Sequence, residues 1–200
     1  MNAEKVRELE MQIYNLGQEL HKLRQQVPPE EVSDYPFRTL EGTTTLSELF
    51  AGQDKLMVIH NMGQGCRYCT LWADGINPFL RHLETVLSVV LVSRDEPELQ
   101  RRFANERGWR FRLASHGGGD YIREQTTIPG QDNVPGVACY QRRDGKIYRL
   151  GASNFGPGDQ HCSLWPLLSL AGFSPENWTP QYTYWNRPEA MDDGGANLKD

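Results

Sequence analysis

The chain has 200 residues, a net charge of −5 and an acidic pI of about 5.6. This length is enough for one domain with a hydrophobic core and additional arms. Lysine and arginine are scattered along the sequence, which argues against a nucleic-acid-binding surface. No apolar run reaches the length that a membrane span requires. We therefore expect neither nucleic acid nor a membrane as a partner.

The first ten residues, MNAEKVRELE, are charged from Glu4 onward and contain no apolar stretch of the secretory type. We therefore expect a cytoplasmic protein, whose thiols stay reduced. Four cysteines in 200 residues are too few for a disulfide scaffold. In a reducing compartment, two cysteines close together indicate catalysis or metal binding.

Composition divides the chain into three parts. Residues 1–27 are predicted to form a coiled-coil helix that Pro28 and Pro29 end. Residues 28–173 are predicted to form the globular domain. Residues 174–200 begin with an aromatic segment and end in a tail rich in glycine and acidic residues, which we expect to be disordered.

Apolar residues in the first part recur at alternating spacings of three and four, the a/d pattern of a coiled coil. They are Val6, Leu9, Ile13, Leu16, Leu20, Leu23 and Val27. Mostly β-branched residues at a, with leucine at d, favour a parallel two-stranded coil. In that arrangement Lys5 faces Glu10 of a second copy, and Glu19 faces Arg24. We expect a parallel homodimer through residues 6–27; the alternative is a single helix that lies on its own domain.

The globular domain alternates strands with helices and then closes with a hairpin, which indicates an α/β fold. The predicted elements are a β unit and helical turn at 35–50, a buried strand at 55–62, a helix at 66–84 interrupted at Gly75 and Pro78, a buried strand at 86–94, a helix capped by Asp95 and ending at Gly108, a strand at 109–115, a hairpin turning at Asp144–Gly145, and a helix at 163–173. The two buried strands are almost continuously apolar, as in a parallel sheet that is covered on both faces.

The motif Cys66-Arg67-Tyr68-Cys69 lies where the strand at 55–62 ends and a helix begins. The free N–H groups and the positive dipole end of a first helical turn stabilise a thiolate, so we expect a lowered pKa for Cys66. Arg67 adds a positive charge beside this thiolate. Cys66 can then attack a substrate disulfide, and Cys69 can attack the resulting mixed disulfide and release the product.

The same cysteine pair could also be half of a zinc site, with His161 and Cys162 as the other half. Adjacent ligands are awkward for one tetrahedral metal ion, and a second CxxC motif is absent. Two buried thiols without a role are another alternative, but Gly63 and Gly65 indicate a flexible approach loop instead. We expect no metal and no cofactor.

The strand KLMVIHNM, the CRYC motif that opens a helix, and the later segment NVPGVACYQRRDGKIYRL together resemble a thioredoxin-like protein. The resemblance implies a central mixed sheet flanked by helices. It also places Val134 and Pro135 where thioredoxins have a cis-proline loop, which faces the dithiol and pairs with an extended substrate. The resemblance favours a cis bond before Pro135, although trans is the commoner state of such bonds.

Four further stretches, CRYCTLWADGINPF, LSELF, RGWRFRLAS and WTPQYTYWNRP, resemble the bacterial family catalogued as domain of unknown function 899. Members of this thioredoxin-like family are labelled predicted dithiol-disulfide oxidoreductases. The resemblance covers about residues 35–188 and does not include the N-terminal helix.

Two departures from related families concern the site. Thioredoxins carry a buried acid six residues before the first cysteine, and the equivalent residue here is His60, which implies proton transfer to and from the inner thiol; the alternative is a core histidine. Peroxiredoxins use a threonine and a proline where this chain has Gly63 and Gly65, which makes peroxide reduction the weaker hypothesis. The stretch between Trp109 and Val134, which includes residues 116–125, is longer than in a minimal thioredoxin and could cover the site as a lid.

We therefore predict a thiol-disulfide oxidoreductase with Cys66 and Cys69 as catalytic residues. Its substrate would be a disulfide-containing protein or a small-molecule thiol, held by Arg67, Tyr68 and the loop at 134–135. The alternatives are a peroxiredoxin-like or glutaredoxin-like reductase, and a non-catalytic adaptor that dimerises through its coil.

Overall fold

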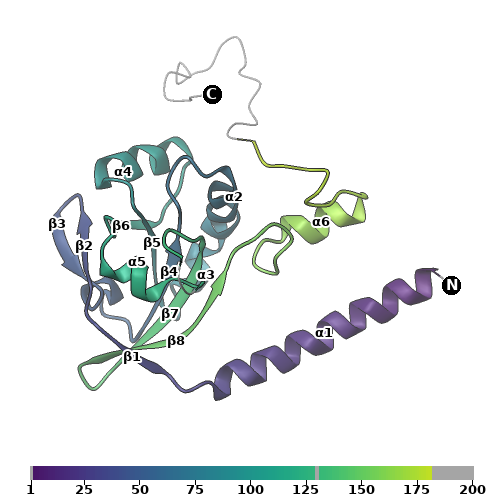
Figure 1. Cartoon of the computed structure of the whole chain (residues 1–200), viewed down its shortest axis with the longest axis horizontal. Coiled ribbons are helices and arrows are strands. Elements are labelled where there is room, and N and C mark those ends of the chain that lie inside the picture. Colours follow the sequence, from purple (N-terminus) through teal and green to yellow (C-terminus); the bar gives the residue numbers. More distant parts are fainter. Residues whose placement is uncertain (1, 129–130, 182–200) are drawn as a thin grey trace, which may run out of the picture.

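The computed structural model describes residues 2–128 and 131–181 (Figure 1). Its strands are β1 (Glu30–Val32), β2 (Pro36–Thr39), β3 (Gly42–Thr45), β4 (Lys55–His60), β5 (Ser88–Ser93), β6 (Arg112–Ser115), β7 (Gly136–Arg143) and β8 (Lys146–Asn154). Its helices are α1 (Asn2–Gln26), α2 (Arg67–Ile76), α3 (Leu80–Leu83), α4 (Pro97–Glu106), α5 (Asp120–Gln125) and α6 (Leu164–Leu170), with short 3-10 turns η1 (Glu48–Phe50) and η2 (Asn77–Phe79).

All eight described strands belong to one mixed sheet, in the order β1-β8-β7-β4-β5-β6-β2-β3. Strands β4, β5 and β6 are parallel, whereas β7 is antiparallel to β4 and forms a hairpin with β8. The register places His60 between Val92 of β5 and Gly136 of β7. The carboxyl ends of the three parallel strands therefore meet at one edge of the sheet, where α/β proteins usually have their ligand sites.

The sheet separates two hydrophobic cores, because successive side chains of a strand point to opposite faces. One core contains side chains from α2, α3, α4 and α6, together with the odd-numbered residues of β4 and β5. The other core contains side chains from η1 and α5, together with the even-numbered residues of the same strands. Every residue of β5 is buried, which confirms the prediction of a strand covered on both faces.

Most of the predicted elements are confirmed. The hairpin turns at Asp144 and Gly145, whose φ angles of 52° and 73° are those of a two-residue type I′ turn. The helix predicted at 66–84 is interrupted by η2, which contains Pro78. One prediction is wrong: Asp95 does not cap α4, since the N-cap is Glu96 without a side-chain bond and the Asp95 carboxylate binds elsewhere.

Within the stretch at 116–125, residues 120–125 form α5, whose side chains Tyr121, Ile122 and Gln125 are buried. Helix α5 is therefore a part of the core and does not form a lid over the site. At the other end of the domain, Trp178 packs edge-on against Trp165 of α6 with 5.7 Å between ring centroids. The tail that we predict to be disordered lies largely within residues 182–200, outside the described residues.

Helix α1 has no buried residue and extends away from the domain (Figure 1). This arrangement excludes the alternative of a helix that lies on its own domain. Pairing with a second copy stays a prediction. Within the described residues, none of the helices is both long and apolar enough to cross a membrane.

Candidate active site

Cys66 is the N-cap residue of α2, with an extended backbone at φ −100° and ψ 99°. Its Sγ accepts a hydrogen bond from the backbone N–H of Cys69 at 3.2 Å, as a serine or threonine oxygen does in an ordinary N-cap. Its carbonyl accepts hydrogen bonds from both the N–H and the Oγ1 of Thr70, each at 3.0 Å. The first turn of α2 therefore holds the Cys66 sulfur against free helical N–H groups, as the spacing predicts.

Cys69 lies one turn further along the helix and is buried, whereas Cys66 is partly exposed. The Cys69 Sγ accepts a hydrogen bond from the N–H of Met62 at 3.5 Å. Both cysteines are free thiols in this structure. The arrangement presents one sulfur to an incoming molecule and keeps the second behind it.

The two thiols have opposite acidities. The pKa of Cys66 is lowered to about 6, mainly because the Cys69 thiol donates a hydrogen bond to it, and the N–H groups of Cys69 and Tyr68 add to this effect. The same hydrogen bond, together with burial, raises the pKa of Cys69. Near neutral pH the negative charge is therefore on the accessible sulfur and the proton is on the inner one.

A tight loop connects β4 to α2 and is fixed by side chains on both sides. Asn61 Oδ1 accepts the N–H of Gly63, and Asp95 Oδ2 accepts the N–H of Gln64, both at 2.8 Å. Gly63 has a φ of +113°, and a Cβ at this residue would lie 2.9 Å from Asp95 Oδ1. Only glycine therefore fits both the backbone conformation and the close approach of the carboxylate. The Gly63 carbonyl then accepts the N–H of Cys66 at 3.0 Å, which places the thiol.

The loop before β7 lies beside the dithiol loop, because Asn133 Nδ2 donates to the carbonyl of Met62 at 3.3 Å. Val134 is buried, and the carbonyl of Pro135 accepts the N–H of Phe155 at 2.9 Å. The expected cis bond before Pro135 is wrong, since the described residues contain no cis peptide bond. Here Asn133, with a φ of 53°, turns the chain into β7 while the bond stays in the commoner trans state.

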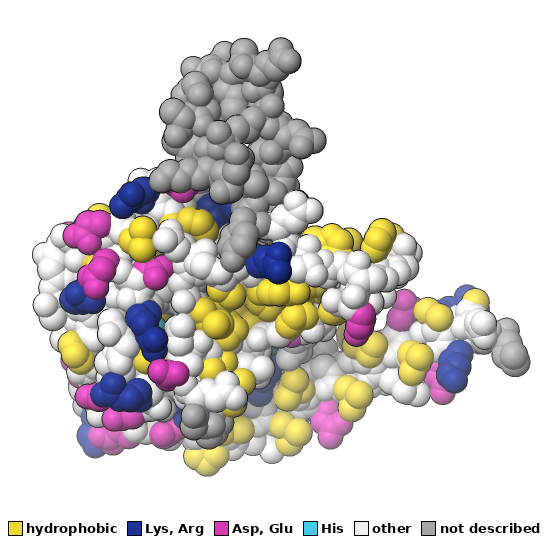
Figure 2. All heavy atoms as spheres, turned by 45° about the horizontal axis from the view of Figure 1, so that its top comes forward, with side chains coloured by type: hydrophobic (Ala, Val, Ile, Leu, Met, Phe, Trp, Pro, Cys, Tyr) yellow, Lys and Arg dark blue, Asp and Glu magenta, His cyan; other side chains and the backbone are white. Residues whose placement is uncertain are grey.

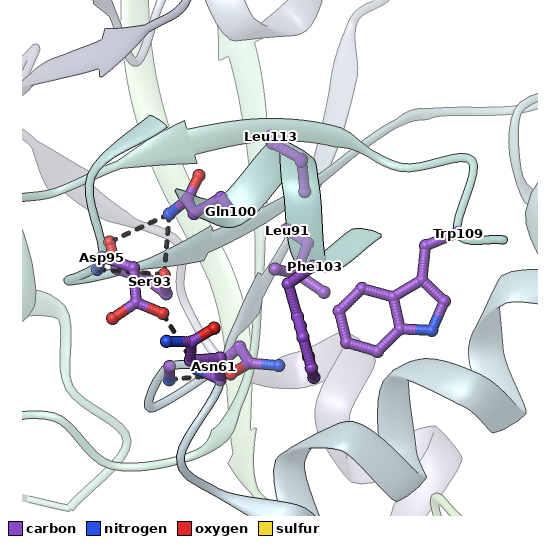
Figure 3. A pocket seen from close by; sticks show the side chains of 10 residues that line it. Asn61, Leu91, Ser93, Asp95, Gln100, Phe103, Trp109 and Leu113 are labelled. Carbon is purple, nitrogen blue, oxygen red and sulfur yellow. Dashed lines mark hydrogen bonds between the residues drawn. The ribbon is translucent and has the colours of Figure 1, made fainter. Parts of the chain in front are cut away.

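A small cavity lies behind the dithiol loop (Figure 3). Asn61, Ser93, Asp95 and Gln100 gather at one end of it, and Leu91, Phe103, Trp109 and Leu113 lie toward the other. Its volume is about 10 Å³, which is space for about one water molecule. The cavity is too small to hold a substrate.

The two residues between the cysteines lie at this surface. Arg67 is exposed, and Tyr68 is half-buried with its ring centroid 6.2 Å from that of Trp72. Trp72 is itself fully buried and stacks on Phe155 at 5.4 Å. Tyr68 thus forms an aromatic rim next to Cys66, supported by the core underneath it.

His60 is buried among core residues on the face of the sheet that α5 covers. Its Nε2 hydrogen-bonds to the Tyr121 hydroxyl at 2.6 Å. Burial, with smaller effects from His116 and Arg149, lowers its pKa to about 3, so the ring is neutral near neutral pH. In this structure His60 is therefore a core histidine, the alternative considered above, and its hydrogen bond goes to a side chain. Proton transfer from His60 to the dithiol stays a prediction.

The residues considered as a second half of a zinc site have other partners. His161 Nε2 hydrogen-bonds to Ser153 Oγ at 2.9 Å, and Cys162 is buried, which raises its pKa. Burial also raises the pKa of Cys139 in β7. Within residues 2–128 and 131–181, no three His, Cys, Asp or Glu side chains are grouped so that they could hold a metal ion.

The sequence matches the family described as bacterial protein of unknown function, DUF899, over residues 3–190. The chain belongs to this family. The match also includes helix α1, which corrects the expectation that the family pattern begins near residue 35. No curated protein matches this DUF899 chain.

Several solved structures share its fold. The bacterioferritin comigratory protein of Xanthomonas campestris, whose structure is described together with alkyl peroxide reduction, is 18% identical with a TM-score of 0.52 and covers 68% of this chain and 90% of its own. Peroxidoxin BcpB of Mycobacterium tuberculosis is 16% identical with a TM-score of 0.52 and covers 72% of this chain and 96% of its own. These similarities show that the DUF899 chain shares the thioredoxin-like fold of these proteins.

Sequence reasoning missed three residues that shape the site: Asn61, Asp95 and Asn133. Asn61 carries a usable signal, because asparagine two residues before a glycine is typical of a turn closed by the side chain. Asp95 lies two residues after the end of β5, and the carboxyl ends of neighbouring parallel strands meet at one edge. Asn133 has no local signal that connects it to the dithiol loop of this DUF899 chain.

Proposed function

We propose that this DUF899 protein is a thiol-disulfide oxidoreductase that uses Cys66 and Cys69. The observation that supports this most directly is the hydrogen bond from the N–H of Cys69 to the Cys66 sulfur in the first turn of α2. Two further features agree with it: the lowered pKa of Cys66 and the buried position of Cys69 one turn behind. An accessible thiolate with a protonated thiol behind it is what two successive exchange steps require.

In the first step the Cys66 thiolate attacks one sulfur of the substrate disulfide. A mixed disulfide forms, the substrate S–S bond breaks, and one substrate thiolate leaves. In the second step Cys69 loses its proton and attacks the Cys66 sulfur, which forms the Cys66–Cys69 disulfide and releases the second substrate thiolate. The substrate gains two electrons and the protein loses two, so an external thiol reductant must restore the dithiol for turnover.

The charge changes during this reaction help the second step. The pKa of Cys69 is raised chiefly because its thiol donates to the Cys66 sulfur. Once Cys66 is in the mixed disulfide, that sulfur carries no negative charge, and the Cys69 proton is held less strongly. Cys69 is thus more acidic in the mixed disulfide than in the reduced protein, at the stage when it has to act as the nucleophile.

We propose that substrates contact Arg67, Tyr68, Val134 and Pro135. Arg67 and Tyr68 lie at the surface beside Cys66, and Asn133 connects the loop at 134–135 to Met62 in the dithiol loop. The cavity behind the loop is too small for a ligand. These features suit a disulfide presented at the surface, on an extended segment of a protein or in a small molecule.

Peroxide reduction is the second candidate, because the solved structures of similar fold include a protein described with alkyl peroxide reduction and a peroxidoxin. In this reaction the Cys66 thiolate attacks the O–O bond, which gives a sulfenic acid and an alcohol or water. Cys69 then condenses with the sulfenic acid to a disulfide and releases water. Gly63 and Gly65 make it the weaker candidate, since neither offers the hydroxyl or the rigid turn found at these places in peroxiredoxins.

The test measures turnover of the reduced protein with a disulfide and, in parallel, with an alkyl hydroperoxide, using dithiothreitol as reductant. We expect disulfide turnover to be faster and Cys66→Ser to abolish it. Cys69→Ser should retain the first attack and accumulate a mixed disulfide, seen by mass spectrometry. Cys162→Ser is the matched control and should turn over normally. Full activity of Cys66→Ser would contradict the proposal, and faster peroxide turnover would favour the second candidate.

A further inference from the structure

Helix α1 presents an unpartnered apolar face along its whole length. All seven residues of the a/d pattern are exposed, including Ile13 at 70%, Leu16 at 63% and Val6 at 54%. Figure 2 shows hydrophobic side chains following one another along this helix, with acidic and basic side chains beside them. A helix of this kind is marginal in isolation, because most helical stability in proteins comes from packing an apolar face.

The pattern on this face matches a second helix with the same sequence. The seam repeats every seven residues from Val6 to Val27, which brings each a and d residue opposite its own copy in a parallel pair. The flanking charges agree with that pairing, because Lys5 then faces Glu10 of the second copy and Glu19 faces Arg24.

The antiparallel arrangement lacks these charge pairs. When two such helices overlap fully in opposite directions, Lys5 lies near Gln26 of the other copy and Glu19 lies near Gln12. Each charge then faces an uncharged amide. Charge complementarity therefore selects the parallel pair over the antiparallel one.

We propose that a second copy of this chain covers the apolar face of α1, and that the protein is a homodimer joined by a parallel two-stranded coiled coil. Only residues 27–29 separate α1 from β1, and β1 is paired with β8 from Val32 to Glu30. Two of these three residues are Pro28 and Pro29, which restrict the backbone. The two dithiol domains are therefore held side by side at the same end of the coil on short connections.

The experiment measures the molar mass of the full-length protein by light scattering during size-exclusion chromatography. We expect twice the chain mass of 22.9 kDa for the wild type. The variant Ile13→Asp/Leu16→Asp should have the mass of one chain, because it puts charges at an a and a d position. The matched control Asn15→Asp/Gln18→Asp adds the same charges to the opposite face of the same turn and should remain a dimer. A wild-type monomer, or a dimer that survives Ile13→Asp/Leu16→Asp, would overturn the proposal.

The direction of the two helices is tested with Leu23→Cys in a chain whose Cys66 and Cys69 are replaced by serine. In the parallel pair, residue 23 faces residue 23 of the other copy, so mild oxidation should give a covalent dimer in high yield. In the antiparallel pair, residue 23 lies near residue 6, and cross-linking should fail although the mass in solution is that of a dimer. That result would overturn the parallel arrangement. Neither measurement depends on thiol exchange, so the outcome is independent of the proposed function.

Discussion

Strand β4 leads into two polar regions that are built in different ways. The dithiol turn at 61–69 is mostly local: its N–H groups, glycines and thiols come from one short segment, which Asp95 and Asn133 hold from outside. The region around His60, on the opposite face of the sheet, joins side chains from β4, α5, β7 and the segment before β2. Each region keeps a titratable group near the end of the same strand.

The second region is a continuous chain of hydrogen bonds from the core to the surface. Its contacts are His60–Tyr121 at 2.6 Å, Tyr121–Tyr140 at 3.1 Å, Tyr140–Gln125 at 3.2 Å, Gln125–Tyr35 at 3.3 Å and Tyr35–Glu124 at 2.6 Å. Only Glu124, at its end, is exposed. Burial raises the pKa of Tyr121 and Tyr140 and is the main cause that raises that of Tyr35 to about 12, so these hydroxyls remain protonated.

The difference shows two uses of the same physical effect. In the dithiol turn, hydrogen bonds to the charged form outweigh partial burial, and the pKa of Cys66 falls into the range where the group reacts. Around His60, burial outweighs every other effect and keeps each group neutral. We therefore expect changes in the dithiol turn to alter chemistry and changes in the His60 network to alter stability.

The largest expected effect is a loss of stability in acid that comes from buried histidines. His60 and His116 have pKa values lowered to about 3 and about 4, mainly by burial. The unfolded chain takes up these protons near pH 6.5 and the folded chain does not, so stability is complete above that pH and falls as the pH decreases toward 4. When the pH is lowered from 7 to 5, each histidine should decrease the free energy of unfolding by about 2 kcal/mol. Urea unfolding at the two pH values measures the sum.

The variant His116→Gln should remove the contribution of that histidine, about 2 kcal/mol between pH 7 and pH 5. His82→Gln, the same substitution at an exposed histidine, is the matched control. The Cys66 thiol contributes in the same pH range and with the same sign, because its lowered pKa stabilises the fold as the pH rises above about 6. An unfolding free energy that is the same at pH 7 and pH 5 would contradict the neutral, buried state of both histidines.

The next effect concerns the dithiol turn. Gly63→Ala places a Cβ 2.9 Å from Asp95 Oδ1 at a φ of +113°, so the loop must shift. A non-glycine residue at such a backbone angle costs about 1–3 kcal/mol. The Gly63 carbonyl accepts a hydrogen bond from the N–H of Cys66, so a shift of this carbonyl also displaces Cys66. We expect about 3 kcal/mol lower stability and a slower reaction of Cys66 with a disulfide reagent. Gly65→Ala is the matched control, since a Cβ there meets no atom within 4 Å. If both variants had the same stability and the same Cys66 reactivity, the close approach of Asp95 to Gly63 would not matter for the site.

The local parts of the structure could be predicted from the sequence. Continuous apolar runs indicate β4 and β5, Asp144–Gly145 indicates the hairpin turn, and the CxxC spacing places Cys66 at a helix start. In each case the signal and the structure lie within a few residues of each other. The same reason explains why α1 is exposed with an intact a/d pattern: the pattern is complete within one helix and needs nothing from the domain.

The long-range parts could not be predicted. The sequence around Asp95 predicts a helix cap, but its carboxylate accepts a hydrogen bond from the N–H of Gln64, which is 31 residues away in the sequence. Tyr121 lies in a glycine-flanked stretch that reads as a surface lid, and only the packing of α5 against the sheet brings it to His60, 61 residues away. The resemblance to thioredoxins favours a cis bond before Pro135, whereas the turn depends on Asn133 with its φ of 53°. Contacts of this kind depend on the final topology, which local patterns do not contain.

The smallest effect tests whether the two regions are independent. Tyr121→Phe removes the hydroxyl that His60 Nε2 and Tyr140 share, and His60 Nδ1 already has no hydrogen-bond partner. A buried polar group left without a partner costs about 1–3 kcal/mol, and we expect a value near the lower end because the ring stays in place. Tyr148→Phe, on the hairpin, is the matched control. The pH midpoint of Cys66 alkylation should stay near 6 in both variants. A shift of this midpoint in Tyr121→Phe alone would instead connect His60 to the dithiol, as the proton-transfer role requires.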